Sequence, residues 1–477
     1  MQIKINNILI YENSTIRDAM KAISIGEIGV ALSVKRKNNS FIRIITDGDI
    51  RRALLDGYGL KSSIKVIDKK ESVVVGLDTQ QSEVTAMFGD QIRIIPVVND
   101  KQQVVNLYFY DKRNHLAVAN PLFDDKEIEL VNECMVSGWI SSGGKFVKEF
   151  EEAVAKHTDV KYAVSCSSGT SALHLILLAH GIGVGDEVII PSLTFIATAN
   201  AVTYSGAKPV FIDSDIETWN IDTNKIESAI TNNTKAIIPV HLYGHPANMD
   251  SINKIAKKHN LKVIEDAAEA QGSHYKGRKV GSLGDASTFS FFGNKIITTG
   301  EGGMVVTDDP IIAEKCRLFR DHGMSTNKRY WHTVLGYNYR LTNIQAAIGV
   351  AQMDKIDSII SKKKWIASEY KKHLRGLKGV TLPPNMDWAD NVFWLYTILI
   401  DCNHDNLIAK LKRNGIDSRP VFPPIHTQPI YQSGLVLPVS EKISRYGISL
   451  PSSPSLNGDD ILKICNVIKN VVEPSKI

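Results

Sequence analysis

Tyr162-Ala-Val-Ser165 opens the stretch that decides the fold, because the Ser- and Gly-rich turn Ser167-Ser-Gly-Thr170 and a helical run from Ser171 to His180 follow it. Apolar strands of this kind that alternate with helices are typical of a mainly parallel sheet covered on both faces. Such a sheet binds its ligand beyond the carboxyl ends of the strands. We therefore predict an α/β domain, with further strands at Glu187–Ile190, Pro209–Ile212, Ala236–Val240, Val263–Asp266 and Ala286–Phe291, and a smaller C-terminal lobe with a strand at Val392–Ile400.

Three features near predicted strand ends carry chemistry. The turn Ser167–Thr170 can cradle a phosphate at a helix N-terminus, although Ser and Thr are also common helix caps. Asp266 can bind Mg²⁺, a ribose or a protonated ring nitrogen, or it can simply cap a loop. Lys295 lies between an aromatic strand and a glycine-rich turn. Partial burial there would lower the pKa of its amine, as carbonyl chemistry requires, although it could be an ordinary loop lysine.

Together the three features match the needs of pyridoxal 5′-phosphate. This cofactor requires an anchor for its phosphate, a carboxylate for its pyridinium nitrogen and a lysine for its aldehyde. We therefore predict pyridoxal 5′-phosphate, with its pyridoxamine phosphate form in the half-reaction. No metal site is predicted, because the five cysteines are scattered and never form a C-x-x-C pair.

Residues 120–477 resemble the pyridoxal-phosphate-dependent nucleotide-sugar aminotransferases of the DegT/DnrJ/StrS group. The resemblance is carried by Gly138–Ser142, Ser168–Thr170, Glu265–Glu269, Ser290–Gly303 and Gly336–Asn343. Within the group, Pro239–Pro246, Asp321–Met324 and Arg329–His332 are most similar to the branch that makes GDP-perosamine. The resemblance implies aminotransferase fold type I, with a large domain of the seven-stranded type over residues 119–355 and a small α+β lobe over residues 356–477.

The resemblance also implies roles for individual residues. By matching position, Lys295 and Asp266 would be catalytic, through the cofactor aldehyde and the ring nitrogen. Asn338 would reach the phosphate from a neighbouring subunit, which implies an obligate homodimer or a higher homo-oligomer. Without the resemblance, core packing or loop capping would explain Phe195, Ser290 and Asn338. The other implied cofactor contacts are Ser168, Gly169, Thr170 and Ser290 at the phosphate, Phe195 on the ring and Glu269 near the phenolic oxygen; the substrate-side candidates are Trp139, Tyr330, His332 and His426.

The N-terminal region contains an internal repeat, because a helix and two strands recur about 60 residues later. It resembles a tandem cystathionine-β-synthase (CBS) domain, which we place at residues 1–118. The resemblance implies that Thr46 and Asp49 contact a regulatory nucleotide, with Leu107 and Tyr110 at the matching places of the second copy. Alternatively, Thr46 and Asp49 only cap the following helix, and the domain serves docking or dimerisation.

Composition narrows the class of protein. Over 477 residues, 56 Lys and Arg stand against 51 Asp and Glu, for a net charge of +5. This small excess favours neither nucleic acid nor a membrane surface as a partner. The N-terminus lacks the apolar core of a signal peptide, and no apolar run is long enough to span a bilayer. We therefore expect a cytoplasmic protein.

The resemblance implies transamination of a nucleotide-linked 4-keto-6-deoxy sugar, with L-glutamate as amino donor, for surface polysaccharide such as lipopolysaccharide O-antigen. GDP-4-keto-6-deoxymannose is the substrate that the perosamine-like stretches favour, although the sequence leaves the base, the sugar and the ketone position open. One alternative is the sugar dehydratase on the same scaffold, which Lys295 disfavours because that enzyme has histidine there. Another is a non-catalytic regulator that senses nucleotides.

Overall fold

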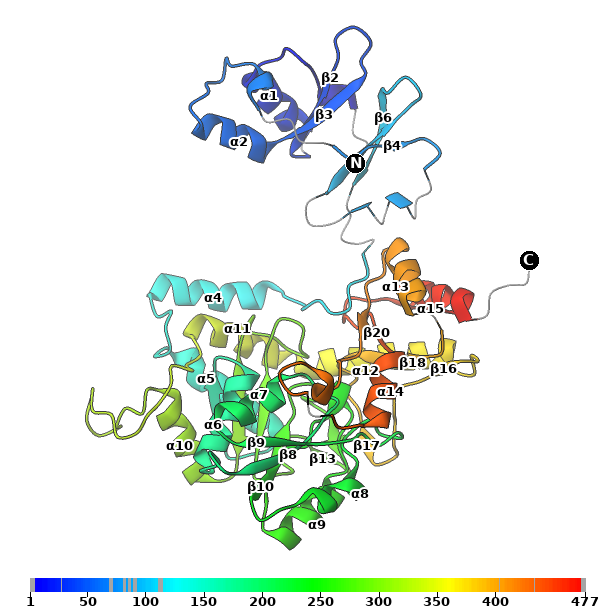
Figure 1. Cartoon of the computed structure of the whole chain (residues 1–477). Helices are drawn as coiled ribbons and strands as arrows, with labels where there is room; N and C mark the ends of the chain where they lie inside the picture. Colours follow the sequence, from blue (N-terminus) through cyan, green and yellow to red (C-terminus); the bar gives the residue numbers. More distant parts are fainter. Residues whose placement is uncertain are drawn as a thin grey trace. The chain divides into compact units, whose positions relative to one another are not determined.

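We describe the protein from a computed structural model. The structure describes residues 5–26, 28–67, 72–79, 83–84, 87–88, 92–109, 115–402, 404–432 and 434–472. The chain divides into two compact units, Met1–His115 with Lys412–Gly415, and Leu116–Leu411 with Ile416–Ile477. Figure 1 labels the elements of both units.

The N-terminal unit contains two small sheets with the same strand arrangement. In the first, β1 (Leu9–Tyr11) is parallel to β2 (Val30–Val34), which is antiparallel to β3 (Phe41–Thr46). In the second, β4 (Val75–Gly76), β5 (Ile94–Val98) and β6 (Val104–Phe109) pair in the same way. Helices α1 (Ile16–Gly26) and α2 (Asp47–Leu55) accompany the first sheet (Figure 1). The strand pairing thus shows the repeat that the sequence predicts.

The register of these strands corrects one detail of the predicted repeat. Thr46 forms the last pair of its hairpin, and Phe109 forms the last pair of the other. Leu107 lies two pairs earlier, at the place of Ile44, so the predicted match of Leu107 with Thr46 is wrong. The side chain of Leu107 is buried in an apolar cluster that contains residues of both repeats, which explains why an apolar residue occupies this position. Tyr110 lies outside the described residues.

A seven-stranded sheet forms the centre of the second unit, in the order β7-β15-β14-β11-β10-β8-β9. Neighbouring strands are parallel except at β15 (Gly303–Thr307), which is antiparallel to both β14 and β7. The prediction of a mainly parallel sheet is confirmed, and β15 makes the sheet a mixed one. The other strands are β7 (Tyr162–Cys166), β8 (Glu187–Pro191), β9 (Lys208–Ile212), β10 (Thr234–Ile237), β11 (Lys262–Asp266) and β14 (Ala286–Ser290).

Helices cover both faces of this sheet (Figure 1). Successive side chains of a strand point to opposite faces, so Ala163 and Val164 of β7 enter different apolar clusters. The cluster of Val164 includes α6 (Gly169–Ala179), α7 (Ala197–Tyr204) and α10 (Pro310–Arg320). The cluster of Ala163 includes α4 (Asp125–Ser137), α5 (Lys145–Thr158), α9 (Met249–His259) and α11 (Asn343–Asp354).

The C-terminal part of this unit is built on a four-stranded antiparallel sheet, β16-β18-β20-β19. Its strand β18 (Tyr396–Ile400) is shorter than the predicted strand Val392–Ile400, because residues 391–395 form irregular backbone that ends in a bend. The other elements are α12 (Ile356–Leu374), β16 (Val380–Thr381), α13 (His404–Arg413), β19 (Arg419–Pro420), α14 (Pro438–Tyr446), β20 (Gly447–Leu450) and α15 (Gly458–Val472); α8 (Thr223–Ile226) and a sheet of β12 (His274–Tyr275), β13 (Arg278–Lys279) and β17 (Ala389–Asp390) complete the unit.

The described residues contain neither a membrane-spanning helix nor a cluster of metal ligands. None of their helices combines the length and the apolar character that crossing a bilayer requires. Nor do three or more of their His, Cys, Asp and Glu side chains gather where they could hold a metal ion.

Candidate active site

A cavity of about 420 Å³ lies where several strands of the large sheet end and the C-terminal part of the unit begins. This is the edge at which a parallel sheet is expected to bind its ligand. Residues from β11, β14 and the turn after β7 meet residues from β19 and β20 there. Eight of the predicted cofactor residues line it together: Ser168, Gly169, Thr170, Phe195, Asp266, Glu269, Ser290 and Lys295.

The turn before α6 offers a binding place for an anion. Ser168 caps the helix, because its hydroxyl accepts from the Ser171 amide and its own amide donates to the Ser171 hydroxyl. The capping interpretation of Ser168 is therefore correct. The amides of Gly169 and Thr170 still have no acceptor within the helix, and they lie at the positive end of its dipole. A Cβ at Gly169 would lie 3.0 Å from Cβ of Ser290, so glycine lets these two segments approach.

Asp266 ends β11 inside the cavity and is 5% exposed. Its carboxylate accepts from the Thr198 hydroxyl at 2.7 Å and from the Ala268 amide at 3.2 Å. Burial raises the pKa of Asp266, while these two hydrogen bonds and the charge of Lys295 oppose that rise. Within the described residues it forms no ion pair. A buried carboxylate of this kind is stabilised by a cation, and a protonated ring nitrogen would supply one.

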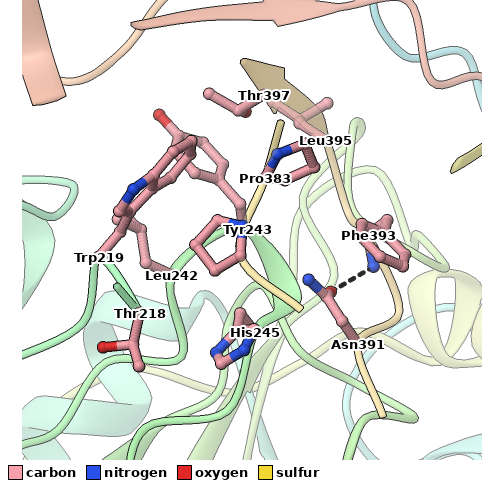
Figure 2. A pocket seen from close by; sticks show the side chains of 11 residues that line it. Thr218, Trp219, Leu242, Tyr243, His245, Pro383, Asn391, Phe393, Leu395 and Thr397 are labelled. Atoms are coloured by element: carbon pink, nitrogen blue, oxygen red, sulfur yellow. Dashed lines mark hydrogen bonds between the residues drawn. The ribbon is translucent and has the colours of Figure 1, made fainter. Parts of the chain in front are cut away.

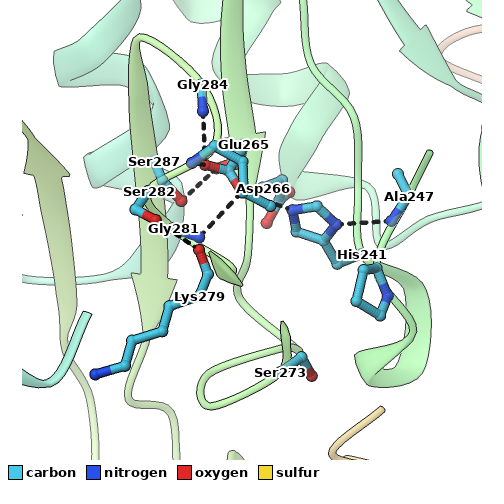
Figure 3. Close-up of polar contacts among 12 residues, drawn as sticks. His241, Ala247, Glu265, Asp266, Ser273, Lys279, Gly281, Ser282, Gly284 and Ser287 are labelled. Carbon is cyan, nitrogen blue, oxygen red and sulfur yellow. Dashed lines mark hydrogen bonds and ion pairs between the residues drawn. The ribbon is translucent and has the colours of Figure 1, made fainter. Parts of the chain in front are cut away.

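Glu265, the preceding residue of β11, points to the other side and is completely buried. Figure 3 shows its carboxylate at the centre of a hydrogen-bond network. His241 donates to Glu265 from Nε2 at 3.0 Å and accepts the Ala247 amide at Nδ1, which makes the ring the neutral Nε2–H tautomer. The His241 amide also donates to the carbonyl of Asp266. The network therefore fixes the end of β11, and its other donors are the amides of Gly281, Leu283 and Gly284.

Lys295 lies beside a second buried carboxylate, because its Nζ is 3.8 Å from Oε1 of Glu269. Burial lowers the pKa of the Lys295 amine, and the charges of Glu269 and Asp266 oppose this effect. Burial raises the pKa of Glu269 to about 7, against the lowering effects of Lys295 and of the Tyr243 amide, which donates to it at 2.8 Å. An amine with a lowered pKa is a good nucleophile toward a carbonyl.

Aromatic rings form the remaining walls of the cavity. Phe195 lines it, is 55% exposed, and its ring centroid lies 5.8 Å from that of Phe422, so much of the side chain is accessible from the cavity. Trp394 lies under the Lys295 amine, 3.8 Å from Nζ to the ring centroid. Arg419 adds a positive charge to the lining.

Sequence reasoning missed Thr198, Trp394 and Arg419. The sequence indicated Thr198 only weakly. It lies within one helical turn of Phe195, which is a predicted contact of the cofactor ring. Trp394 carried a misleading signal, because it fell inside a predicted strand. Arg419 precedes a proline-rich loop, and nothing in that pattern indicates a binding site.

Four predicted residues lie outside the cavity of this chain. Trp139 is 62% exposed, Tyr330 is 75% exposed, and His332 and Asn338 are also exposed. The side-chain oxygen of Asn338 accepts from Nε of Arg340 at 3.1 Å. Their roles toward substrate or toward a neighbouring subunit stay predictions.

His426 differs from its predicted substrate-side position. It is 2% exposed and does not line the cavity. Its Nδ1 lies 2.7 Å from the Ser192 hydroxyl and its Nε2 lies 3.2 Å from a Glu441 carboxylate oxygen. Both ring nitrogens of His426 therefore have partners, which join the loop after β8 to α14, and its role toward substrate stays a prediction.

Thr46 and Asp49 form a capping box at the start of α2. The Thr46 hydroxyl accepts from the Asp49 amide, and the Asp49 carboxylate accepts from the Thr46 amide at 3.0 Å. Arg52 also pairs with Asp49. The two residues therefore do cap α2, and nucleotide contact by the same residues stays a prediction.

The residues in the cavity fit pyridoxal 5′-phosphate. The free amides of Gly169 and Thr170 suit its phosphate, the uncompensated carboxylate of Asp266 suits its ring nitrogen, and the buried amine of Lys295 suits its aldehyde. The exposed aromatic side chain of Phe195 suits its ring.

Comparison with known proteins agrees with this chemistry. The chain is 49% identical to GDP-perosamine synthase of Escherichia coli O157:H7, over 74% of this chain and 98% of that protein. The crystal structure of DesV from S. venezuelae with a ketimine intermediate is 36% identical, covers 73% of this chain and 95% of its own, and has a TM-score of 0.70. The PLP form of the putative sugar aminotransferase Spr1654 from Streptococcus pneumoniae is 28% identical over 75% and 99% of the two chains, with a TM-score of 0.72.

These findings confirm the predicted enzyme class, a pyridoxal-phosphate-dependent sugar aminotransferase, and its type I fold. The model of the DegT/DnrJ/EryC1/StrS aminotransferase family matches residues 121–469. The chain therefore belongs to the DegT/DnrJ/EryC1/StrS aminotransferase family.

Proposed function

We propose that the protein transfers the amino group of L-glutamate to GDP-4-keto-6-deoxymannose and forms GDP-perosamine. The observation that carries the proposal is the single cavity that holds Lys295, Asp266 and the Ser168–Thr170 turn. The choice of sugar rests on the 49% identity to GDP-perosamine synthase of Escherichia coli O157:H7.

Pyridoxal 5′-phosphate, when bound, supplies a carbonyl that exchanges amino groups and a ring that accepts the electron pair of a broken C–H bond. Asp266 holds the proton on the ring nitrogen, because its buried carboxylate is stabilised by that cation. Lys295 moves the proton between the substrate carbon and C4′ of the cofactor. The Glu269 carboxylate lies 3.8 Å from the Lys295 amine and stabilises the positive charge that the amine carries when it holds the proton.

Arg419 supports binding of anionic substrates at the same cavity. The lining contains the acidic residues Asp266, Glu269 and Glu301, and Lys295 is engaged in the chemistry. Arg419 is the remaining cation of the lining and is exposed. It can attract a glutamate carboxylate or a sugar diphosphate.

A panel of keto sugars tests the proposal. The holoenzyme is incubated with glutamate and GDP-4-keto-6-deoxymannose or the UDP- and dTDP-linked 4-keto-6-deoxy sugars, and the products are identified by mass spectrometry. The proposal expects an amino sugar from the GDP substrate and the release of 2-oxoglutarate. Turnover of only a UDP or dTDP substrate would overturn the base assignment. A deoxygenated keto sugar without amine would instead support the dehydratase, and no turnover with any substrate would support a non-catalytic regulator.

We also propose that the working unit is a homodimer or a higher homo-oligomer. The predicted residues Trp139, Tyr330, His332 and Asn338 are exposed. Large apolar side chains are also exposed on α4 and directly after it, and in the loop before Asn338: Ile128, Met135, Val136, Ile140, Trp331 and Leu335. An apolar surface of this kind marks an interaction site. Covering it with a second copy would bring Asn338 of one subunit to the phosphate of the other.

Mixed oligomers test this assignment. Lys295→Ala and Asn338→Ala chains, each inactive alone, are unfolded, mixed in equal amounts and refolded. If the active site is shared between two subunits, mixed dimers contain one intact site, and about one quarter of wild-type activity returns. No recovered activity in verified mixed dimers would contradict the shared site.

We further propose that the N-terminal unit, Met1–His115, is a CBS pair that binds one regulatory nucleotide through Thr46 and Asp49. The repeated strand arrangement of the two sheets supports the pair, and Phe109 at the place of Thr46 leaves a single polar half-site. Calorimetric titration of the full chain with adenine and guanine nucleotides tests it, with Asp49→Ala as the variant expected to lose binding. No heat with any nucleotide would leave a docking or dimerisation module.

A further inference from the structure

The Lys295 amine rests on the indole face of Trp394, a residue outside the predicted cofactor set. Nζ lies 3.8 Å from the ring centroid. An ammonium at this distance is attracted by the negative face of the ring, most strongly when water is excluded. Trp394 is 3% exposed, so water is largely excluded from its surroundings.

Trp394 is fixed relative to Lys295 by its own contacts. The indole N–H donates to the carbonyl of Asn294 at 2.7 Å, and Asn294 directly precedes Lys295. The ring of Tyr243 stacks beside the indole of Trp394. The two ring centroids are 6.1 Å apart, and the angle between the ring planes is 19°. The indole and the lysine backbone are therefore held as one assembly.

The segment that carries Trp394 is also held by an internal hydrogen bond and by a contact from α12. Figure 2 shows the hydrogen bond from the Phe393 amide to the Asn391 side-chain oxygen, at 2.6 Å. From α12, the amine of Lys363 donates to the carbonyls of Trp394 and Ser452, both at 2.9 Å. Lys363 is 3% exposed, and burial lowers its pKa to about 7. A neutral amine has two N–H donors, and the two carbonyls satisfy both.

We propose that Trp394 is a catalytic residue whose indole face holds and orients the free Lys295 amine during proton transfer, and that Lys363 is a positioning residue that fixes Trp394 through its carbonyl. The inference rests on the proposed function, because Lys295 must become a free amine in each half-reaction.

The proposed step moves one proton and needs no oxidant or reductant. With pyridoxal 5′-phosphate bound, Lys295 would take the proton from the α-carbon of glutamate and return it to C4′, and the cofactor would hold the electron pair of the broken C–H bond in between. During this interval the lysine is an ammonium. The ring face of Trp394 stabilises that charge and limits the directions in which the flexible side chain can point.

The glutamate half-reaction of the holoenzyme tests the proposal. Its rate is followed by stopped-flow absorbance of the cofactor with ordinary and 2-deuterated glutamate. Trp394→Leu is expected to slow it roughly threefold to thirtyfold, the range from an exposed to a desolvated cation–π contact. The slowed reaction should carry a primary isotope effect at least as large as that of wild type, at saturating cofactor. Trp394→Phe, which keeps a weaker ring face, should lie between the two.

Lys363→Met tests the positioning role, with Lys362→Met as its matched control on the same helix. Lys362 lies over the ring of Trp365, away from the cavity lining. Lys363→Met is expected to slow the half-reaction in the same isotope-sensitive way, and Lys362→Met should leave it unchanged. If Lys363→Met fails to fold, the two Trp394 variants still decide the catalytic role.

An unchanged half-reaction in Trp394→Leu would overturn the inference. So would a slower reaction without an isotope effect, or a loss of cofactor affinity alone, because both assign the ring to another task. Wild-type protein that does not react with glutamate would refute the amino donor instead, so the failures of the two proposals are distinguishable.

Discussion

Glu265 and Asp266 are sequence neighbours on β11, yet burial gives them different tasks. Alternation along the strand places Asp266 in the cavity and Glu265 on the opposite side. From the sequence, Glu265 is expected to tolerate substitution better than Asp266. The structure reverses this expectation for stability, because Glu265 has four hydrogen-bond donors and no exposed surface.

Glu265→Ala is predicted to destabilise the fold strongly. It leaves buried N–H groups without an acceptor, and each one costs about 1–3 kcal/mol. Chemical unfolding of the cofactor-free protein measures the loss. Glu149→Ala, at an exposed position of α5, is the control and should change stability by less than about 0.5 kcal/mol. Asp266→Ala should chiefly lose cofactor affinity. Equal stability of Glu265→Ala and Glu149→Ala would refute the structural role.

Lys295→Ala is predicted to abolish the absorbance band of the lysine-linked cofactor and to slow amino transfer by at least about 10²-fold, because it removes the acid–base relay. Absorbance spectra and turnover measure the two effects. Cofactor can still bind through the phosphate contacts and Asp266. Near-normal turnover in this variant would show that the lysine is misassigned.

The buried position of Glu269 predicts a dependence of stability on pH. Its pKa rises from 4.5 to about 7 on folding, so between these values the folded protein binds more protons than the unfolded chain. The free energy of unfolding of the cofactor-free protein should therefore fall as pH rises through this window. Urea unfolding at several pH values measures the slope. Glu269→Gln should give a shallower slope, and an unchanged slope would place its pKa near the ordinary value.

At the scale of elements, the site depends on the close approach of β15 to the turn before α6. A Cβ at Gly303 would lie 2.2 Å from the carbonyl oxygen of Ser168. The backbone cannot yield without moving the amides that are proposed to bind the phosphate.

Gly303→Ala is therefore predicted to weaken cofactor binding and to destabilise the protein by about 1–3 kcal/mol, as overpacking does. Titration with pyridoxal phosphate and thermal unfolding measure the two effects. Gly458→Ala is the matched control, because a Cβ there meets no atom within 4 Å. Wild-type affinity in Gly303→Ala would show that the turn does not anchor the cofactor.

At the scale of the whole molecule, the catalytic unit begins before the predicted boundary at residue 119. Leu116 is 6% exposed, and its carbonyl accepts from the Asp417 amide at 2.9 Å. Val118 is 1% exposed, and its carbonyl accepts from the Ser452 amide at 2.7 Å. Residues 116–118 are therefore part of the catalytic unit.

A chain that begins at Leu116 is predicted to fold and to keep amino-transfer activity, because all residues of the cavity lie beyond residue 160. A chain that begins at Pro121 should be less stable by several kcal/mol, since burying a large apolar side chain contributes about 1.5–3 kcal/mol. Turnover and thermal unfolding of the two chains measure this. A folded but inactive Leu116 chain would show that catalysis needs the N-terminal unit.

The sequence by itself determined the parallel α/β sheet, the capped turn before α6 and the positions of Asp266 and Lys295 at one edge. These features follow from local periodicity and from the rule that strand ends carry the site, so residues near in sequence suffice. Only the tertiary structure decided that Trp394, Arg419 and Thr198 join them and that His426 does not. The outcomes for Trp394 and Arg419 depend on how the C-terminal sheet returns to the cavity and how residues 391–395 lead into its strand, and that for Thr198 depends on how α7 packs beside Asp266. Contacts between residues so distant in sequence are set by packing of the whole unit, which no local pattern encodes.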